Sequence, residues 1–124
     1  MHILLLEPNT LLAGMYTQAF RRSGYTIVAA GEAQAALQAA EETRPDVVIL
    51  ELQLPAHSGI EFLHEFRSYA EWQHVPIIVN TYMPIPQLTL GGELVHRDLG
   101  ICAVLYKPQT SLAELLAAVR GVKA

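Results

Sequence analysis

The stretch VVILELQLPA at residues 47–56 decides the fold, because a strongly apolar run ends there on an acid and then turns at a proline. Residues 47–50 are apolar at every position, which is typical of a strand buried on both faces of a parallel sheet. Glu51 follows at the point where such a strand leaves the core. The sequence therefore raises the question whether Glu51 is a reactive carboxylate or marks a reactive site that has been disabled.

Further apolar runs alternate with helix-like segments on both sides of this stretch. The expected strands are residues 2–6, 25–30, 46–50, 75–80 and 103–106. Apolar residues at helical spacing predict helices between the strands and a last helix capped by Ser111. Residues 82–100 contain prolines and paired glycines, so an irregular loop with a short helix near 93–98 is expected there. This alternation predicts one α/β domain with a five-stranded parallel sheet.

Composition narrows the function classes. The chain has 124 residues, a formal charge of −4 and scattered basic residues, which argues against a nucleic-acid partner. No apolar run approaches the roughly 20 residues that cross a bilayer, so no membrane association is expected. The single cysteine, Cys102, excludes an internal disulfide, is typical of a reducing cytoplasm, and is expected to be a buried inert thiol.

Polar residues follow the predicted strands at the point where each one ends. Ligands of open parallel sheets collect outside the carboxyl ends of the strands. Two carboxylates, a hydroxyl and an ammonium are therefore expected to meet at one edge, although they are far apart in the sequence. The residues at this edge are Glu7, Pro8, Asn9, Glu51, Asn80, Thr81, Lys107 and Pro108.

The order ILLLEPN, PDVVILELQLP, PIIVNT and LYKP resembles the receiver domain of bacterial two-component response regulators over nearly the whole chain. The resemblance implies a single doubly wound (βα)5 domain over residues 1–124, with flavodoxin-like topology and strand order 2-1-3-4-5. It also implies that a histidine kinase phosphorylates an aspartate at the end of the third strand. In the family, two acids after the first strand help to hold Mg²⁺, and a hydroxyl and a lysine contact the phosphate.

By position, Glu51 corresponds to the phosphoacceptor, Glu7 and Pro8 to the acidic pair, Thr81 to the hydroxyl, and Lys107 to the lysine. Two departures affect the chemistry that the resemblance implies. Pro8 offers no side-chain oxygen, and Mg²⁺ is normally held by carboxylates. Glu51 moves its carboxylate outward by roughly 1–1.5 Å, and a misplacement of about 1 Å can cost about 100-fold in rate. No metal site is therefore expected, and Glu7 and Glu51 are the weak candidates for one.

The switch residues of the family also differ here. The position that usually carries an aromatic ring three residues before the lysine is Val104, and Thr81 is followed by the bulky Tyr82. The longer side chain of Glu51 is expected to reach Lys107. That contact could imitate a phosphoryl oxygen and hold an active-like state, or it could be an inherited buried ion pair without a signal.

These residues predict a receiver-like module that is not an enzyme, uses no cofactor and binds a protein without phosphorylation control. The expected partner is a histidine kinase or downstream effector that binds the surface formed by residues 82–122, and a homodimer is a second mode of association. The alternative is a working phosphoacceptor that uses Glu51 with weak Mg²⁺ binding. A flavodoxin-type nucleotide binder is a third reading, although EPNTLLAG lacks the Ser/Thr/Gly-rich run of a phosphate cradle.

Overall fold

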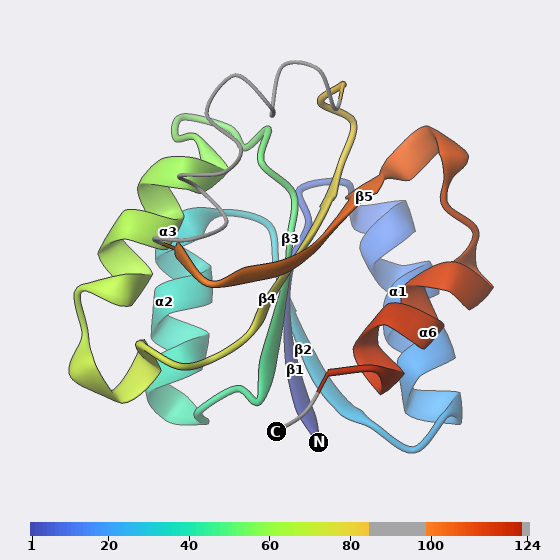
Figure 1. The fold of residues 1–124 in the computed structure, drawn as a ribbon, viewed down its shortest axis with the longest axis horizontal. Coiled ribbons are helices and arrows are strands. Elements are labelled where there is room, and N and C mark those ends of the chain that lie inside the picture. Colours follow the sequence, from blue (N-terminus) through green and yellow to red (C-terminus); the bar gives the residue numbers. More distant parts are fainter. Residues whose placement is uncertain (85–98, 123–124) are drawn as a thin grey trace.

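A computed structural model describes residues 1–84 and 99–122 of the chain. Its strands form one sheet in the order β2-β1-β3-β4-β5, and each neighbouring pair is parallel. The strands are β1 (His2–Leu6), β2 (Thr26–Ala30), β3 (Val47–Leu50), β4 (Ile77–Thr81) and β5 (Ile101–Tyr106). The predicted doubly wound α/β fold and its strand order are therefore confirmed (Figure 1).

Helices cover both faces of the sheet (Figure 1). One face carries α1 (Thr10–Arg22) and α6 (Leu112–Arg120), and the other carries α2 (Ala33–Glu42) and α3 (Gly59–Arg67). Because side chains alternate along a strand, Ile3 and Leu5 enter the core beneath α1 and α6, whereas Leu4 and Leu6 enter the opposite core. Two-sided burial explains why the central strand β3 is apolar at every position.

Polar side chains cap three of the four α-helices that lie within the described residues. The side chains of Asn9 and Ser58 accept hydrogen bonds from N–H groups in the first turns of α1 and α3. Ser111 and Glu114 form a capping box at α6, which confirms the cap predicted there. Each cap satisfies N–H groups that the helix itself leaves free, and so determines where the loop after a strand becomes helical.

The start of β5, an edge strand, differs from the prediction. It begins at Ile101, and Cys102 is exposed, so the expected burial of the thiol is wrong. Ile77 pairs with Ile101 and Ile78 pairs with Ala103, which leaves Cys102 as an extra residue at a bulge. Its thiol donates a hydrogen bond to the carbonyl oxygen of Ile77 at 3.2 Å. The bulge therefore gives this apolar-looking segment an exposed residue that alternation does not predict.

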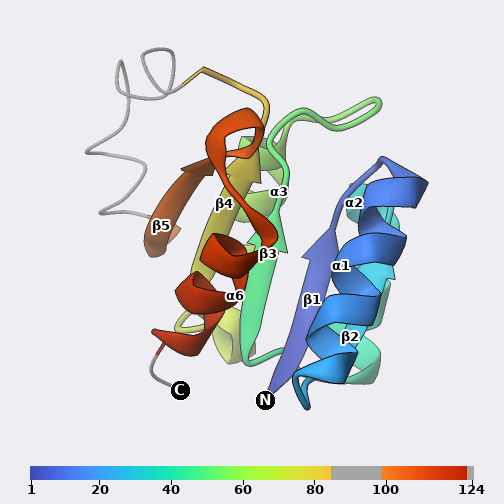
Figure 2. The same ribbon diagram turned by 90° about the vertical axis from the view of Figure 1, so that its right-hand side faces the viewer.

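The expected short helix at residues 93–98, and most of the irregular segment 82–100, lie outside the described residues. Two 3-10 turns complete the described elements, η1 (Ala70–Trp72) before β4 and η2 (Lys107–Gln109) after β5. None of the helices in the described parts of the chain is long and apolar enough to cross a membrane. All strand arrows run toward one edge of the sheet, so the residues that follow the strands meet there (Figure 2).

Candidate functional site

The loop after β3 places Glu51 and a backbone N–H group at the end of the sheet where the carboxyl ends of the strands meet. Glu51 is 3% exposed, and its own N–H donates to the carbonyl of Leu6 at 3.0 Å. The loop then closes on itself, because the N–H of Gly59 donates to the carbonyl of Leu52 at 2.7 Å. A Cβ on Gly59 would lie 2.7 Å from Leu52 Cα, so only glycine permits this close approach. The closed loop places the N–H of Gln53 against the Glu51 carboxylate.

Four donors from three segments of the chain bind the Glu51 carboxylate. Its Oε1 accepts hydrogen bonds from Lys107 Nζ at 2.7 Å and from the N–H of Tyr82 at 3.1 Å. Its Oε2 accepts from the N–H of Gln53 at 3.1 Å and from the hydroxyl of Thr81. An ionised carboxylate has about four acceptor positions, so these donors saturate it. The extra reach of Glu51 toward Lys107, which the sequence predicts, is present in the structure.

Lys107 lies between two buried carboxylates. Its Nζ is 2.6 Å from Glu7 Oε1 and 2.7 Å from Glu51 Oε1. Glu7 Oε2 accepts a second hydrogen bond, from the N–H of Asn9 at 3.0 Å. The ring of Tyr82 covers the ammonium at 4.5 Å from its centroid. Two carboxylates and one ammonium leave the cluster with one net negative charge.

The hydrogen bonds in this cluster favour its charged state. Burial raises the pKa of Glu51, but the hydrogen bonds from Lys107, Thr81 and the Gln53 N–H outweigh burial, and the pKa is lowered from 4.5. Burial lowers the pKa of Lys107, but the hydrogen bonds to Glu51 and Glu7 outweigh it, and the pKa is raised from 10.5. Both groups are therefore ionised at neutral pH.

Two of the predicted site residues contribute no polar group. Pro8 is half-buried next to Glu7 and supplies neither a side-chain oxygen nor an N–H. Val104 pairs with Val79 in the sheet and packs its partly buried side chain against the core beneath α2 and α3. The structure thus brings together four of the six predicted site residues, and these two remain apolar neighbours.

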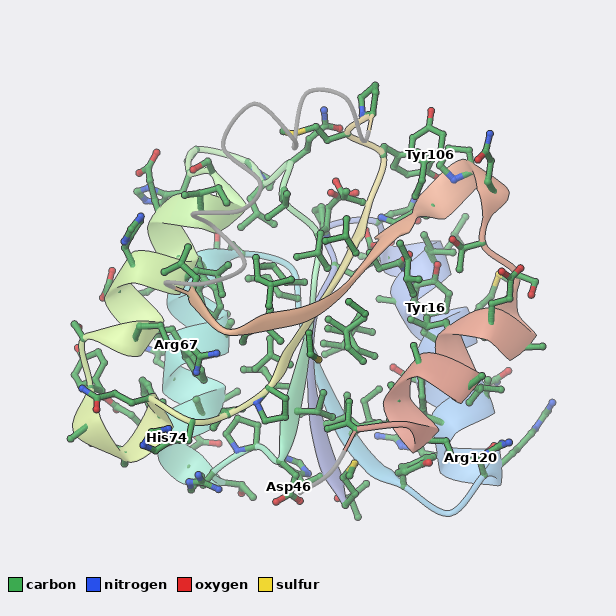
Figure 3. The ribbon with its side chains drawn as sticks, viewed as in Figure 1. Tyr16, Asp46, Arg67, His74, Tyr106 and Arg120 are labelled. Carbon is green, nitrogen blue, oxygen red and sulfur yellow. The ribbon has the colours of Figure 1, made fainter. Side chains whose placement is uncertain are left out.

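Sequence reasoning missed a polar link beneath the pocket. The amide of Asn80 donates to the hydroxyl of Tyr16 at 3.1 Å, which ties β4 to α1. Burial raises the pKa of Tyr16, so this hydroxyl is neutral. Figure 3 labels Tyr16 on α1. Asn80 follows the predicted strand ends, but Tyr16 gives no signal beyond its place on the apolar face of its helix. The backbone donors of Gln53 and Tyr82 could not be predicted from the sequence either, since every residue except proline carries an N–H.

The residues present do not fit a magnesium ion. Mg²⁺ requires near-octahedral oxygen ligands at about 2.0–2.1 Å. Among the described residues, the carboxylates at this end of the sheet are those of Glu7 and Glu51, both bound to Lys107, and Pro8 adds no side-chain oxygen. Among residues 1–84 and 99–122, no group of three or more His, Cys, Asp or Glu side chains could hold a metal ion.

Known proteins share this architecture. Residues 3–120 match the family described as response regulator receiver domain. The chain is 36% identical over 96 residues to the probable transcriptional regulatory protein TcrX of Mycobacterium tuberculosis, covering 73% of this chain and 40% of TcrX. It is 30% identical over 106 residues to the polar-differentiation response regulator DivK of Brucella anthropi, covering 86% of this chain and 83% of DivK. The chain thus spans well under half of TcrX.

Solved structures agree with the sequence matches. The chemotaxis protein CheY4 of Vibrio cholerae superposes with a TM-score of 0.86 at 24% identity, over 98% of both chains. The receiver domain of the sensor histidine kinase PA1611 from Pseudomonas aeruginosa, solved with a magnesium ion in its active-site cleft, gives a TM-score of 0.78 at 26% identity. That match covers 96% of this chain and 93% of the PA1611 domain.

Receiver domains are signalling modules rather than conventional enzymes, and they work with histidine kinases and effector proteins. The family match spans nearly the whole sheet and its helices, from β1 to the end of α6. The relatives include a polar-differentiation response regulator and a probable transcriptional regulatory protein, both of which are named for roles in regulation. This chain belongs to the family of response regulator receiver domains of two-component signal transduction.

Proposed function

We propose that this chain is an atypical receiver domain that works as a protein-interaction module without phosphorylation. The observation that carries the proposal is the saturated carboxylate of Glu51, whose oxygens accept from Lys107, Tyr82, Gln53 and Thr81. A nucleophile needs a free lone pair directed at the incoming phosphorus. Here each oxygen would have to lose a hydrogen bond before it could attack.

The charge of the pocket also opposes phosphoryl transfer. Glu7 and Glu51 outnumber Lys107, so an anionic phosphoryl donor meets a net negative site. In-line transfer depends on positioning and on cationic charge at the phosphoryl oxygens. The longer side chain at Glu51 and the proline at position 8 weaken both conditions. Phosphorylation on Glu51 with weak Mg²⁺ binding is the competing function.

Glu51 supports an active-like arrangement of the segment after β4. In the receiver family, the hydroxyl at the position of Thr81 and the lysine at the position of Lys107 contact the phosphate. Here both contact the Glu51 carboxylate instead. Thr81 Oγ1 also accepts from the N–H of Met83 at 3.0 Å, so Glu51 orders the chain through Thr81 as far as Met83. The carboxylate therefore stands in for a phosphoryl group in the proposed state.

The proposed partner is a histidine kinase or a downstream effector, and the proposed contact surface is residues 82–122. Within the described part of that surface, Tyr82 is 49% exposed and Cys102 is exposed on the edge strand β5. An edge strand with accessible side chains offers a contact surface, and it admits a homodimer as well. We further propose that residues 1–124 form one domain in the cytoplasm, with neither nucleic acid nor membrane as a partner.

The decisive experiment incubates the protein with acetyl phosphate and Mg²⁺ and measures its intact mass. The double variant P8D/E51D restores both acids and is the matched positive control on the same chain. We expect a phosphoryl adduct on the double variant and none on the wild type. An adduct on the wild type that disappears in E51Q would establish the competing phosphoacceptor function.

A second measurement separates imitation of the phosphorylated state from a silent ion pair. The partner can be captured by cross-linking from cells that express the protein, and its affinity compared between wild type and E51Q. Glutamine keeps the length of the side chain but removes the charge that Lys107 and Thr81 bind. Lower affinity for E51Q is the expected result, and equal affinity would reduce the cluster to a structural ion pair.

A further inference from the structure

The ammonium of Lys107 has a complete set of ligands from the chain itself. An ammonium group carries three donors. One donor bonds Glu7 Oε1 at 2.6 Å and another bonds Glu51 Oε1 at 2.7 Å. The remaining side of the ammonium faces the ring of Tyr82, whose centroid lies 4.5 Å from Nζ. Carboxylate, carboxylate and aromatic face together match what a buried primary ammonium requires.

The carboxylates of Glu7 and Glu51 and the ring of Tyr82 form a cage around the Lys107 ammonium. Water is excluded from the part of the cage that the two carboxylates form. The side chains of Lys107, Glu7 and Glu51 are 3–4% exposed. Tyr82 is 49% exposed, so its ring separates the buried ammonium from solvent. The N–H of the same residue donates to Glu51 Oε1 at 3.1 Å, which fixes the backbone position from which the ring extends. Tyr82 thus binds both the cation and one of the anions that surround it.

We propose that Lys107 is the resident cation of this pocket, in place of a divalent metal, and that Tyr82 is the positioning residue that closes the cage around it. The inference rests on the proposed function, because a pocket that never receives a phosphoryl group needs no exchangeable cation. It assigns Lys107 a role toward Glu7 and Glu51 rather than toward a phosphate. It also assigns Tyr82 a role that neither the fold nor the family position requires.

The cage predicts selectivity for an ammonium over Mg²⁺. A divalent ion would have to displace Lys107 from both carboxylates and leave the ammonium buried without partners. Removing the ammonium should instead favour a divalent ion, because the negative charges of Glu7 and Glu51 would then have no cation between them. We expect K107A to bind Mg²⁺ about tenfold or more tightly than the wild type, since the pocket charge changes from −1 to −2.

The first test measures the thermal unfolding midpoint of wild type, K107A and K107A/E7Q in MgCl₂ and in NaCl of equal ionic strength. The wild type should show no shift specific to Mg²⁺. K107A should show a saturable rise, and K107A/E7Q, which keeps only one acid, should lose most of it. A saturable rise in the wild type, or an equal rise in the two variants, would overturn the inference.

The second test needs no variant at Lys107 and so covers the case in which K107A fails to fold. Nitrogen-15 NMR of the lysine side chains reports the exchange of the Lys107 ammonium protons with water. Slow exchange, unchanged by Mg²⁺, is expected in wild type and in Y82F, which keeps the ring. Y82L should accelerate exchange. A Lys107 signal that Mg²⁺ shifts saturably, or equal exchange in Y82L and Y82F, would contradict the assignment.

These results are distinguishable from a failure of the proposed function. A phosphoryl adduct on the wild type with an unperturbed Lys107 signal would refute the phosphorylation-independent role and leave the cage intact. Conversely, Mg²⁺ binding to the wild type without any adduct would refute the cage and leave that role standing.

Discussion

The strand β3 has an acid at each end, and the two acids differ in their exposure to solvent and in the groups that bind them. Asp46 precedes the strand, is partly exposed, and accepts a hydrogen bond from the N–H of His2 at 2.6 Å. Glu51 follows the strand, is 3% exposed, and is bound by Lys107 and three further donors. Figure 3 labels Asp46 at the edge of the sheet opposite the pocket. Among the described residues, Asp46 therefore has one backbone donor, whereas Glu51 has four donors.

Water explains this difference. At the amino end of β3, solvent reaches Asp46, so the desolvation cost of its charge is small. At the carboxyl edge, the neighbouring loops exclude water from Glu51, so an unpaired charge would cost several kcal/mol. Among the described residues, Glu51 has a cation partner and Asp46 has none, and the ammonium of Lys107 lies 2.7 Å from Glu51.

Replacing Lys107 with methionine should destabilise the protein more than any other substitution considered at the two ends of β3. Methionine preserves the volume of the side chain but leaves Glu7 and Glu51 buried without a cation, so we expect a loss of about 3–5 kcal/mol in the free energy of unfolding. Urea unfolding followed by circular dichroism measures the loss. A change below about 1 kcal/mol would mean that water already reaches the carboxylates.

The variant E51Q should have a smaller effect, because it removes the charge and keeps the shape. Glutamine has one acceptor oxygen, so it can accept from Tyr82 and Lys107 or from Gln53 and Thr81, but not from both pairs. Its contact with Lys107 also loses the ionic component. We expect a loss of about 1.5–3 kcal/mol, typical of hydrogen bonds to charged groups. The double variant K107M/E51Q completes a cycle with the two single variants. Additive losses would show that Lys107 and Glu51 are not energetically coupled.

Protonation of Glu51 should contribute to the fall in the free energy of unfolding at acid pH, which is called the acid limb of the stability profile below. Its pKa is lowered from 4.5 in the folded protein, so its stabilising contribution is complete above pH 4.5 and is lost as the pH falls through the folded pKa. Lys107 behaves in the opposite sense, because its pKa is raised from 10.5 and its contribution is lost as the pH rises through the folded pKa. Urea midpoints between about pH 6 and about pH 3 test the acid limb. A profile as steep in E51Q as in the wild type would assign that limb to other carboxyls.

The smallest effect is expected for D46N at the opposite end of β3. The asparagine oxygen can still accept from the N–H of His2, and the site is open to solvent, so the loss should be about 1 kcal/mol or less. Chemical denaturation under the conditions used for K107M provides the matched measurement. A loss as large as that of E51Q would remove the distinction between the two ends of the strand.

Much of this architecture could be predicted from the sequence. Continuous apolar runs marked the strands, and the residue after each run identified Glu7, Glu51, Thr81 and Lys107. This worked because parallel strands bring their carboxyl ends to one edge whatever the loops between them do. The bulge at Cys102 escaped prediction, since an extra residue in a ladder depends on the neighbouring strand.

The sequence by itself determined the doubly wound sheet and the charged residues at its edge, because periodicity and strand ends are local properties of the chain. Only the tertiary structure decided that Lys107 bridges Glu7 and Glu51, that the ring of Tyr82 covers it, and that backbone N–H groups complete the ligands of Glu51. These contacts join residues distant in sequence and depend on how far the packed loops exclude water. Burial sets how strongly a charge needs its partners, and burial exists only once the chain has folded.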